Sequence, residues 1–179
     1  MPADLTERYV DPPSGWPAAE ELAERAAGVD LLLLPEEIRE SERGNIAPFR
    51  ADAQELRVVA RENGLQAELV IPAEAQPAVY SEHAAEWVLP VILSLPAGVA
   101  VNLISTWIQG RLDKRKRGEP MPTLRYRQAE LIDGQIRVRE LEGHADAVIA
   151  VLGGQKPPPR VGHPTTLDTG DEAASDRGE

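Results

Sequence analysis

The side chains best suited to acid–base or metal chemistry in this chain are its three histidines. His144 and Asp146 form a His-x-Asp pair, and Glu142 lies two residues before the histidine. A metal site needs a third and a fourth ligand, and the sequence places none beside this group. We therefore interpret these residues as exposed polar side chains in a turn after Gly143, and predict no metal site.

The remaining candidates for catalysis are equally unsupported by their surroundings. His83 lies in SEHAAEW, where Ser81 suits a helix N-cap, so His83 reads as a first-turn surface residue. His163 lies in the C-terminal tail. Cysteine is absent, which excludes a thiol nucleophile, and no G-x-S-x-G, P-loop or G-x-G-x-x-G pattern occurs. We predict no catalytic residue, no cofactor and no enzymatic activity.

A basic run, RLDKRKR at 111–117, departs from the acidic character of the chain, whose net charge is −11 and isoelectric point about 4.8. We do not expect so acidic a chain to bind nucleic acid, because binding requires a basic surface that neutralises the phosphates. The run has two interpretations: contact with an acidic partner or anionic lipid, or compensation of a helix dipole. The candidate partner or lipid contacts, including two arginines of the following segment, are Arg111, Lys114, Arg115, Lys116, Arg117, Arg125 and Arg127.

Short elements are predicted in the first third of the chain. Residues 1–15 are polar and predict a loose arm, and 17–27 predict a helix that begins with Pro17 and ends near Gly28. Residues 31–34 predict a buried strand, and PEEIRES predicts one helical turn.

Two β-hairpins are predicted from dipeptides that accept a tight turn. LRVVARENGLQAELVIP would turn at Asn63-Gly64, and LRYRQAELI would pair with QIRVREL around Asp133-Gly134. In the second hairpin, Ala129 would face Val138, Leu131 would face Ile136, Glu130 would meet Arg137, and Arg127 would meet Glu140. Leu124 and Tyr126 fall on the opposite face, which predicts a bulge near Gln128. A helix from Asp133 to Gly143 is the competing interpretation, and 143–152 stays open between helix and strand.

The apolar stretch 87–108 decides between classes of function. It has the length to cross a bilayer, and Trp87 and Trp107 lie near its ends. Pro90 and Pro96 interrupt it, however, and a helix starting at Pro96 is amphipathic. Such a helix, over 97–113, would also cover the apolar faces of both hairpins. We favour a buried core helix, with a membrane segment and an oligomer interface as alternatives. The polar stripe of this helix would comprise Asn102, Ser105, Thr106, Gln109 and Asp113.

The segment LPAGVAVNLISTWIQGRLDKRKR, followed by a strand, a D-G turn and a second strand, carries a family resemblance. Over residues 55–152 the order of elements resembles small bacterial accessory proteins of conflict (defence) systems, of the effector-associated constant component type. The resemblance implies an adaptor or constant partner of a separate effector rather than an enzyme, and it carries over no site residues.

The sequence as a whole predicts an α+β fold of two antiparallel β-hairpins packed on a central apolar helix. We expect a flexible arm at 1–15, one domain at 16–152 and a disordered, acidic Pro/Gly-rich tail at 153–179. The N-terminus has neither a basic nor an apolar signal region, so we expect a cytoplasmic protein. We expect a non-enzymatic adaptor that binds another protein. The alternatives are a membrane-acting protein that uses 87–108 and an enzyme whose site the sequence does not show. The central helix could also form a homo-oligomer.

Overall fold

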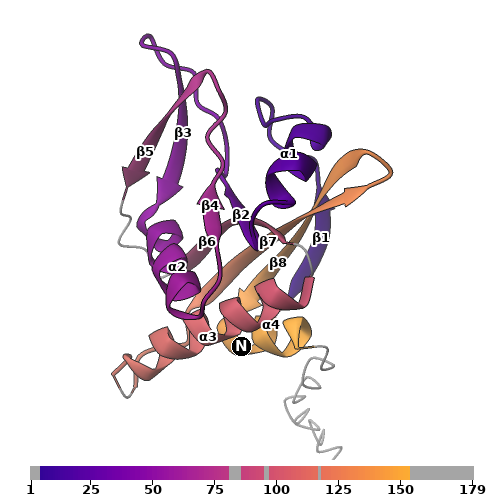
Figure 1. Ribbon diagram of the computed structural model, residues 1–179. Coiled ribbons are helices and arrows are strands. Elements are labelled where there is room, and N and C mark those ends of the chain that lie inside the picture. Colours follow the sequence, from indigo (N-terminus) through magenta and orange to yellow (C-terminus); the bar gives the residue numbers. More distant parts are fainter. Residues whose placement is uncertain (1–4, 81–85, 95–96, 117, 154–179) are drawn as a thin grey trace, which may run out of the picture.

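The computed structural model describes residues 5–80, 86–94, 97–116 and 118–153, which form a mixed α/β fold (Figure 1). A six-stranded sheet has helices on both faces, and two further strands make a separate ribbon. The strands in the described residues are β1 (Thr6–Val10), β2 (Leu31–Leu34), β3 (Asn45–Arg50), β4 (Ala67–Leu69), β5 (Ala75–Tyr80), β6 (Glu86–Ser94), β7 (Thr123–Ile132) and β8 (Gln135–His144). The helices there are α1 (Ala19–Ala26), α2 (Ala51–Glu62), α3 (Ala97–Asp113) and α4 (Ala145–Leu152).

The main sheet has the strand order β1-β8-β7-β6-β2-β4. β6 and β7 pair in parallel, as do β2 and β4, while the other neighbours are antiparallel. All four residues of β2 are buried, because the sheet is covered on both faces at that point. In the separate two-stranded ribbon, β3 pairs with β5 in parallel.

Two apolar clusters hold the main sheet between its helices. On one face α2, α3 and α4 contribute Leu56, Ile104 and Val148 to a cluster that includes Leu124 and Tyr126 of β7. On the other face α1 packs on the residues that alternate with these, such as Ala129 of β7 and Val138 of β8. Successive side chains of a strand point to opposite faces, so β7 and β8 can serve both clusters without a bulge.

The hairpin predicted at Asn63-Gly64 is wrong, because its first arm is helix α2. Ala53, Leu56 and Ala60 recur at helical spacing and are buried, whereas Val58, which would share a face with Leu56 and Ala60 in a strand, is 51% exposed. Asn63-Gly64 ends the helix instead. Gly64 has a φ of 75°, its amide donates to Arg61 O and the following amide, of Leu65, donates to Ala60 O, which is the Schellman arrangement.

The hairpin predicted at Asp133-Gly134 is confirmed as β7 and β8. Asp133 and Gly134 both have positive φ, at 51° and 73°, as a type I′ turn requires. The pairing matches the predicted register, from Leu131 opposite Ile136 to Arg127 opposite Glu140. The expected bulge near Gln128 is wrong, as is the competing helix, since the pairing runs unbroken from Thr123 to Ile132.

The apolar stretch 87–108 is divided between a central strand and a helix. β6 carries its first part through the middle of the sheet, and Pro90 lies at an irregularity in the pairing with β7, where a missing amide is tolerated. The predicted helix over 97–113 is confirmed as α3, with Asn102, Thr106, Gln109 and Asp113 exposed and Ser105 half-buried. Among the described residues, no helix combines the length and apolar character needed to span a membrane.

Several smaller predictions have mixed outcomes. The helix at 17–27 and the strand at 31–34 are confirmed as α1 and β2, and the ambiguous segment 143–152 contains α4. The loose arm is wrong for Thr6–Val10, which forms the edge strand β1, and PEEIRES forms no helical turn. The prediction was two hairpins packed on one helix. The structure instead has one of these hairpins, β7–β8, within a six-stranded sheet that is covered on both faces. Of the predicted tail, residues 154–179 lie outside the described residues.

Candidate functional site

The candidate basic contacts do not form one surface, because the main sheet separates them. Leu124 and Tyr126 of β7 pack in the cluster that includes α3. Arg125 and Arg127 alternate with them and therefore lie on the opposite face, whereas Arg111 lies in the last turn of α3 and the lysines follow this helix. The predicted site divides into a basic helix end and a charged cluster on the far face of the sheet.

Arg111 anchors the end of α3 to α2 and β6. Its guanidinium lies 4.3 Å from the ring centroid of Trp107 and 5.4 Å from that of Trp87, and these two rings meet edge to face. Its Nε donates to Glu55 Oε2 at 2.9 Å, and its Nη2 donates to both Asp52 and Glu55. Trp107 Nε1 donates to the same Glu55 oxygen. Arg111 is thus bound inside the molecule, with its side chain 24% exposed.

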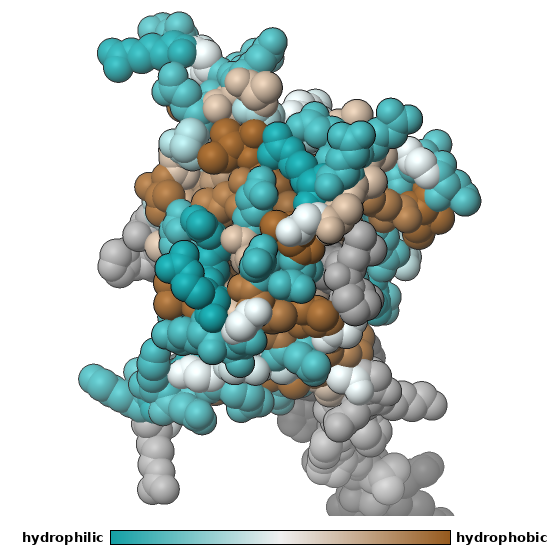
Figure 2. All heavy atoms as spheres, in the orientation of Figure 1, coloured by the Kyte–Doolittle hydropathy of each residue, from teal (hydrophilic) through white to brown (hydrophobic). Residues whose placement is uncertain are grey.

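The rest of the basic run differs residue by residue. Arg115 donates to the carbonyl oxygens of Glu119 and Pro120, which closes the turn that follows α3. Lys114 and Lys116 are exposed, and hydrophilic residues surround this end of the helix at the lower left of Figure 2. Arg117 lies outside the described residues. In the described part of the basic run, the exposed cations are therefore Lys114 and Lys116.

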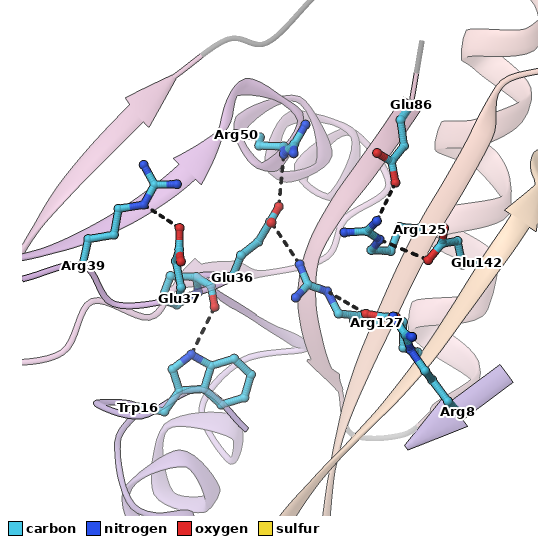
Figure 3. A network of polar contacts seen from close by, with 12 residues as sticks. Arg8, Trp16, Glu36, Glu37, Arg39, Arg50, Glu86, Arg125, Arg127 and Glu142 are labelled. Carbon is cyan, nitrogen blue, oxygen red and sulfur yellow. Dashed lines mark hydrogen bonds and ion pairs between the residues drawn. The ribbon is translucent and has the colours of Figure 1, made fainter. Parts of the chain in front are cut away.

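Arg125 and Arg127 belong to a charged cluster in which four arginines meet four glutamates (Figure 3). Glu36, just after β2, joins Arg50 of β3 at 3.2 Å to Arg127 of β7 at 3.2 Å. Arg127 also lies 4.0 Å from Glu140, which binds Arg8 of β1. The remaining members join Arg125 to Glu86 at 3.1 Å and to Glu142 at 3.5 Å. We call these eight residues the charged cluster.

The charged cluster includes side chains on the sheet face against which α1 packs. Its formal charges cancel. The side chains of Glu36, Arg50, Arg127 and Glu140 are at most 20% exposed, whereas those of Arg8, Glu86, Arg125 and Glu142 are between 33% and 56% exposed. Several buried nitrogens, namely Arg125 Nε and Arg127 Nε and Nη2, lie near carboxylates without forming a well-directed hydrogen bond. The guanidinium groups of Arg125 and Arg127 are thus neutralised by nearby carboxylates but loosely hydrogen-bonded, whereas Arg8 and Arg50 donate directed hydrogen bonds to Glu140 and Glu36. This arrangement fits a structural tie between segments better than a site that binds a further anion.

His144 and Asp146, which the sequence analysis considered as possible metal ligands, lie at the start of α4. His144 is the N-cap residue of α4, with a buried Nδ1, and Asp146 bonds the amide of Ala147 in the first helical turn. Within the described ranges, no group of three or more potential ligands is close enough to hold a metal ion. His83 and His163 lie outside these ranges. Burial raises the pKa of Tyr126 well above its ordinary range. Its hydroxyl donates to Gln128 Oε1, and its ring packs in the apolar core.

Sequence reasoning found some members of these groups and missed others. The hairpin register predicted the Arg127–Glu140 pair, because both residues lie in one local motif. Sequence reasoning missed Glu36 and Glu86, as well as Asp52 and Glu55, because these residues reach their arginines from distant segments. The signal that could have found the latter pair is helical periodicity in 51–62, which would place Asp52 and Glu55 on one side of a helix.

Comparison with protein-family models, with curated proteins and with solved structures finds no match to this chain.

Proposed function

We propose that the chain is a non-enzymatic interaction module of the adaptor type, acting in the bacterial cytoplasm as an accessory component of a conflict system. The observation that supports it best is the way the backbone that carries Lys114 and Lys116 is held. Arg111 fixes the end of α3 before these lysines, and Arg115 bonds two carbonyl oxygens of the turn that follows, while both lysines are exposed. Exposed cations on an otherwise acidic molecule favour an acidic protein partner.

The charged cluster supports the same proposal in a different way. Its arginines are paired with carboxylates of the chain itself. Arg125 and Arg127, two of the candidate contacts, are therefore best regarded as internal ties. The alternative of a membrane-acting protein would require β6 and α3 to leave the core, where Leu89, Ile92 and Ile104 are already buried.

Affinity capture with a matched pair of charge-reversal variants tests this function. The full chain is tagged in its native host, recovered after mild cross-linking, and its partners are quantified by mass spectrometry. A Lys114→Glu/Lys116→Glu variant is expected to lose a specific partner about tenfold or more, since each charge reversal opposes association. Arg43→Glu/Arg61→Glu changes two other exposed cations and serves as the control. Equal recovery with both variants would contradict a contact through the end of α3.

A further inference from the structure

The β3–β5 ribbon is built unlike the rest of the fold. It pairs two strands in parallel over six residues, separately from the main sheet. Pro48 and Pro77 lie within it, and each lacks the amide that a ladder position uses. Parallel sheets are normally larger and covered on both faces, and a two-stranded sheet is marginal by itself. The backbone pairing alone therefore stabilises this ribbon weakly.

The buried apolar packing of the ribbon is also small. Ala47, Phe49 and Ala53 form its buried cluster, and Leu69 of β4 packs against both this cluster and the main core. Val79 on β5 is 55% exposed. α2 bridges the two parts, since Ala53 in its first turn packs with the ribbon, while Leu56 and later residues pack with the main core. Few buried apolar contacts and a thin hydrogen-bond ladder are the properties of regions that open before the whole protein unfolds.

An ionic tie joins the ribbon to the main sheet at one point of the charged cluster. Glu36 binds Arg50, the last residue of β3, through one carboxylate oxygen and Arg127 of β7 through the other. The side chains of these three residues are between 12% and 20% exposed, so the tie is mostly removed from solvent. Glu37, the next residue, binds Arg39 in an exposed pair, and among the described residues it makes no such bridge to the main sheet.

We propose that the β3–β5 ribbon is a separately opening unit of this fold, held closed by the bridge from Arg50 through Glu36 to Arg127. The ribbon opens while β7, β8 and the core under α3 stay folded. Removing the Glu36 charge shifts this local equilibrium toward the open form and leaves the rest of the molecule protected. This property does not depend on the proposed adaptor function.

Native-state hydrogen exchange of the full chain, read by mass spectrometry at several low urea concentrations, tests the proposal. In the wild-type chain, hydrogen-bonded amides of 45–50 and 75–80 should exchange at least about 100-fold faster than those of β7 and β8, with a weaker dependence on urea. Glu36→Gln should accelerate exchange in the ribbon about tenfold further, without a matching change in β7 and β8. Glu37→Gln is the matched control and should stay within about twofold of wild type.

Two results would overturn the proposal. One is a wild-type ribbon that exchanges at the same rate and with the same urea dependence as β7 and β8, because it would then open only by global unfolding. The other is a Glu36→Gln variant that loses protection equally throughout or does not fold, because the bridge would then support the whole fold rather than the ribbon.

Discussion

Replacing Arg111 with methionine is expected to lower the free energy of unfolding by about 3 kcal/mol. Methionine keeps much of the side chain's length and removes its charge, which leaves Asp52 and Glu55 without their shared cation. Removing one partner of a fully buried ion pair costs about 3–5 kcal/mol, and exposed pairs contribute at most about 1 kcal/mol. Since the side chain of Arg111 is 24% exposed, we expect about 2 kcal/mol from the ion pairs.

Stacking on the two indoles supplies the remainder of that estimate. The guanidinium of Arg111 lies over both Trp87 and Trp107, and cation–π contacts of this kind contribute about 0.5–1 kcal/mol each. Losing about 3 kcal/mol should lower Tm by roughly 6–12 °C in a domain of this size. The same tryptophans report the transition, because unfolding changes the environment of their edge-to-face pair.

Equilibrium urea unfolding followed by tryptophan fluorescence measures this change. Arg61→Met, at an exposed position in the last turn of α2, is the control and should stay within about 0.5 kcal/mol of wild type. A double-mutant cycle of Arg111→Met with Glu55→Gln should give a coupling of about 1 kcal/mol or more. If Arg111→Met unfolds within about 0.5 kcal/mol of the wild-type chain, Arg111 does not anchor α3 as described.

Further predictions follow from backbone conformation and from burial. Gly64→Ala should destabilise the chain by about 1 kcal/mol in urea unfolding, because Gly64 has a φ of 75°, and an unchanged midpoint would contradict the Schellman end of α2. Gly110→Ala, inside α3 with open space for a methyl group, should instead be neutral or stabilising by up to about 1 kcal/mol. Above pH about 10, an unfolded tyrosine releases its proton while buried Tyr126 keeps it, so stability should fall by up to about 1.4 kcal/mol per pH unit. Tyr126→Phe should remove this alkaline slope, whereas Tyr9→Phe, at a 61% exposed side chain, should keep it.

Features fixed by local residue chemistry were predictable from the sequence. Asp133-Gly134 specifies a type I′ turn, and the turn then fixes the pairing of β7 with β8, including Arg127 opposite Glu140. The range and polar stripe of α3 were predictable for a similar reason, because one helix face must stay in water.

Features that depend on tertiary packing were not predictable in the same way. The apolar residues of LRVVA fit both a strand and a helix, and the choice depends on packing against α3 and the sheet, which buries Leu56 and Ala60 and exposes Val58. Leu124 and Tyr126 suggested a bulge only because one covered face was assumed. The charged cluster was missed for a related reason, since Glu36 and Glu86 reach β7 from segments far away in the sequence.

Membrane fractionation tests most directly whether residues 87–108 belong to the folded core. The full chain is expressed without detergent, and membranes are collected by ultracentrifugation and washed with alkaline carbonate. We expect the protein in the supernatant as a discrete species, because β6 and α3 bury their apolar side chains against the rest of the fold. Protein retained in the washed pellet would show that this stretch inserts into the bilayer, which would contradict both the described core and the proposed adaptor.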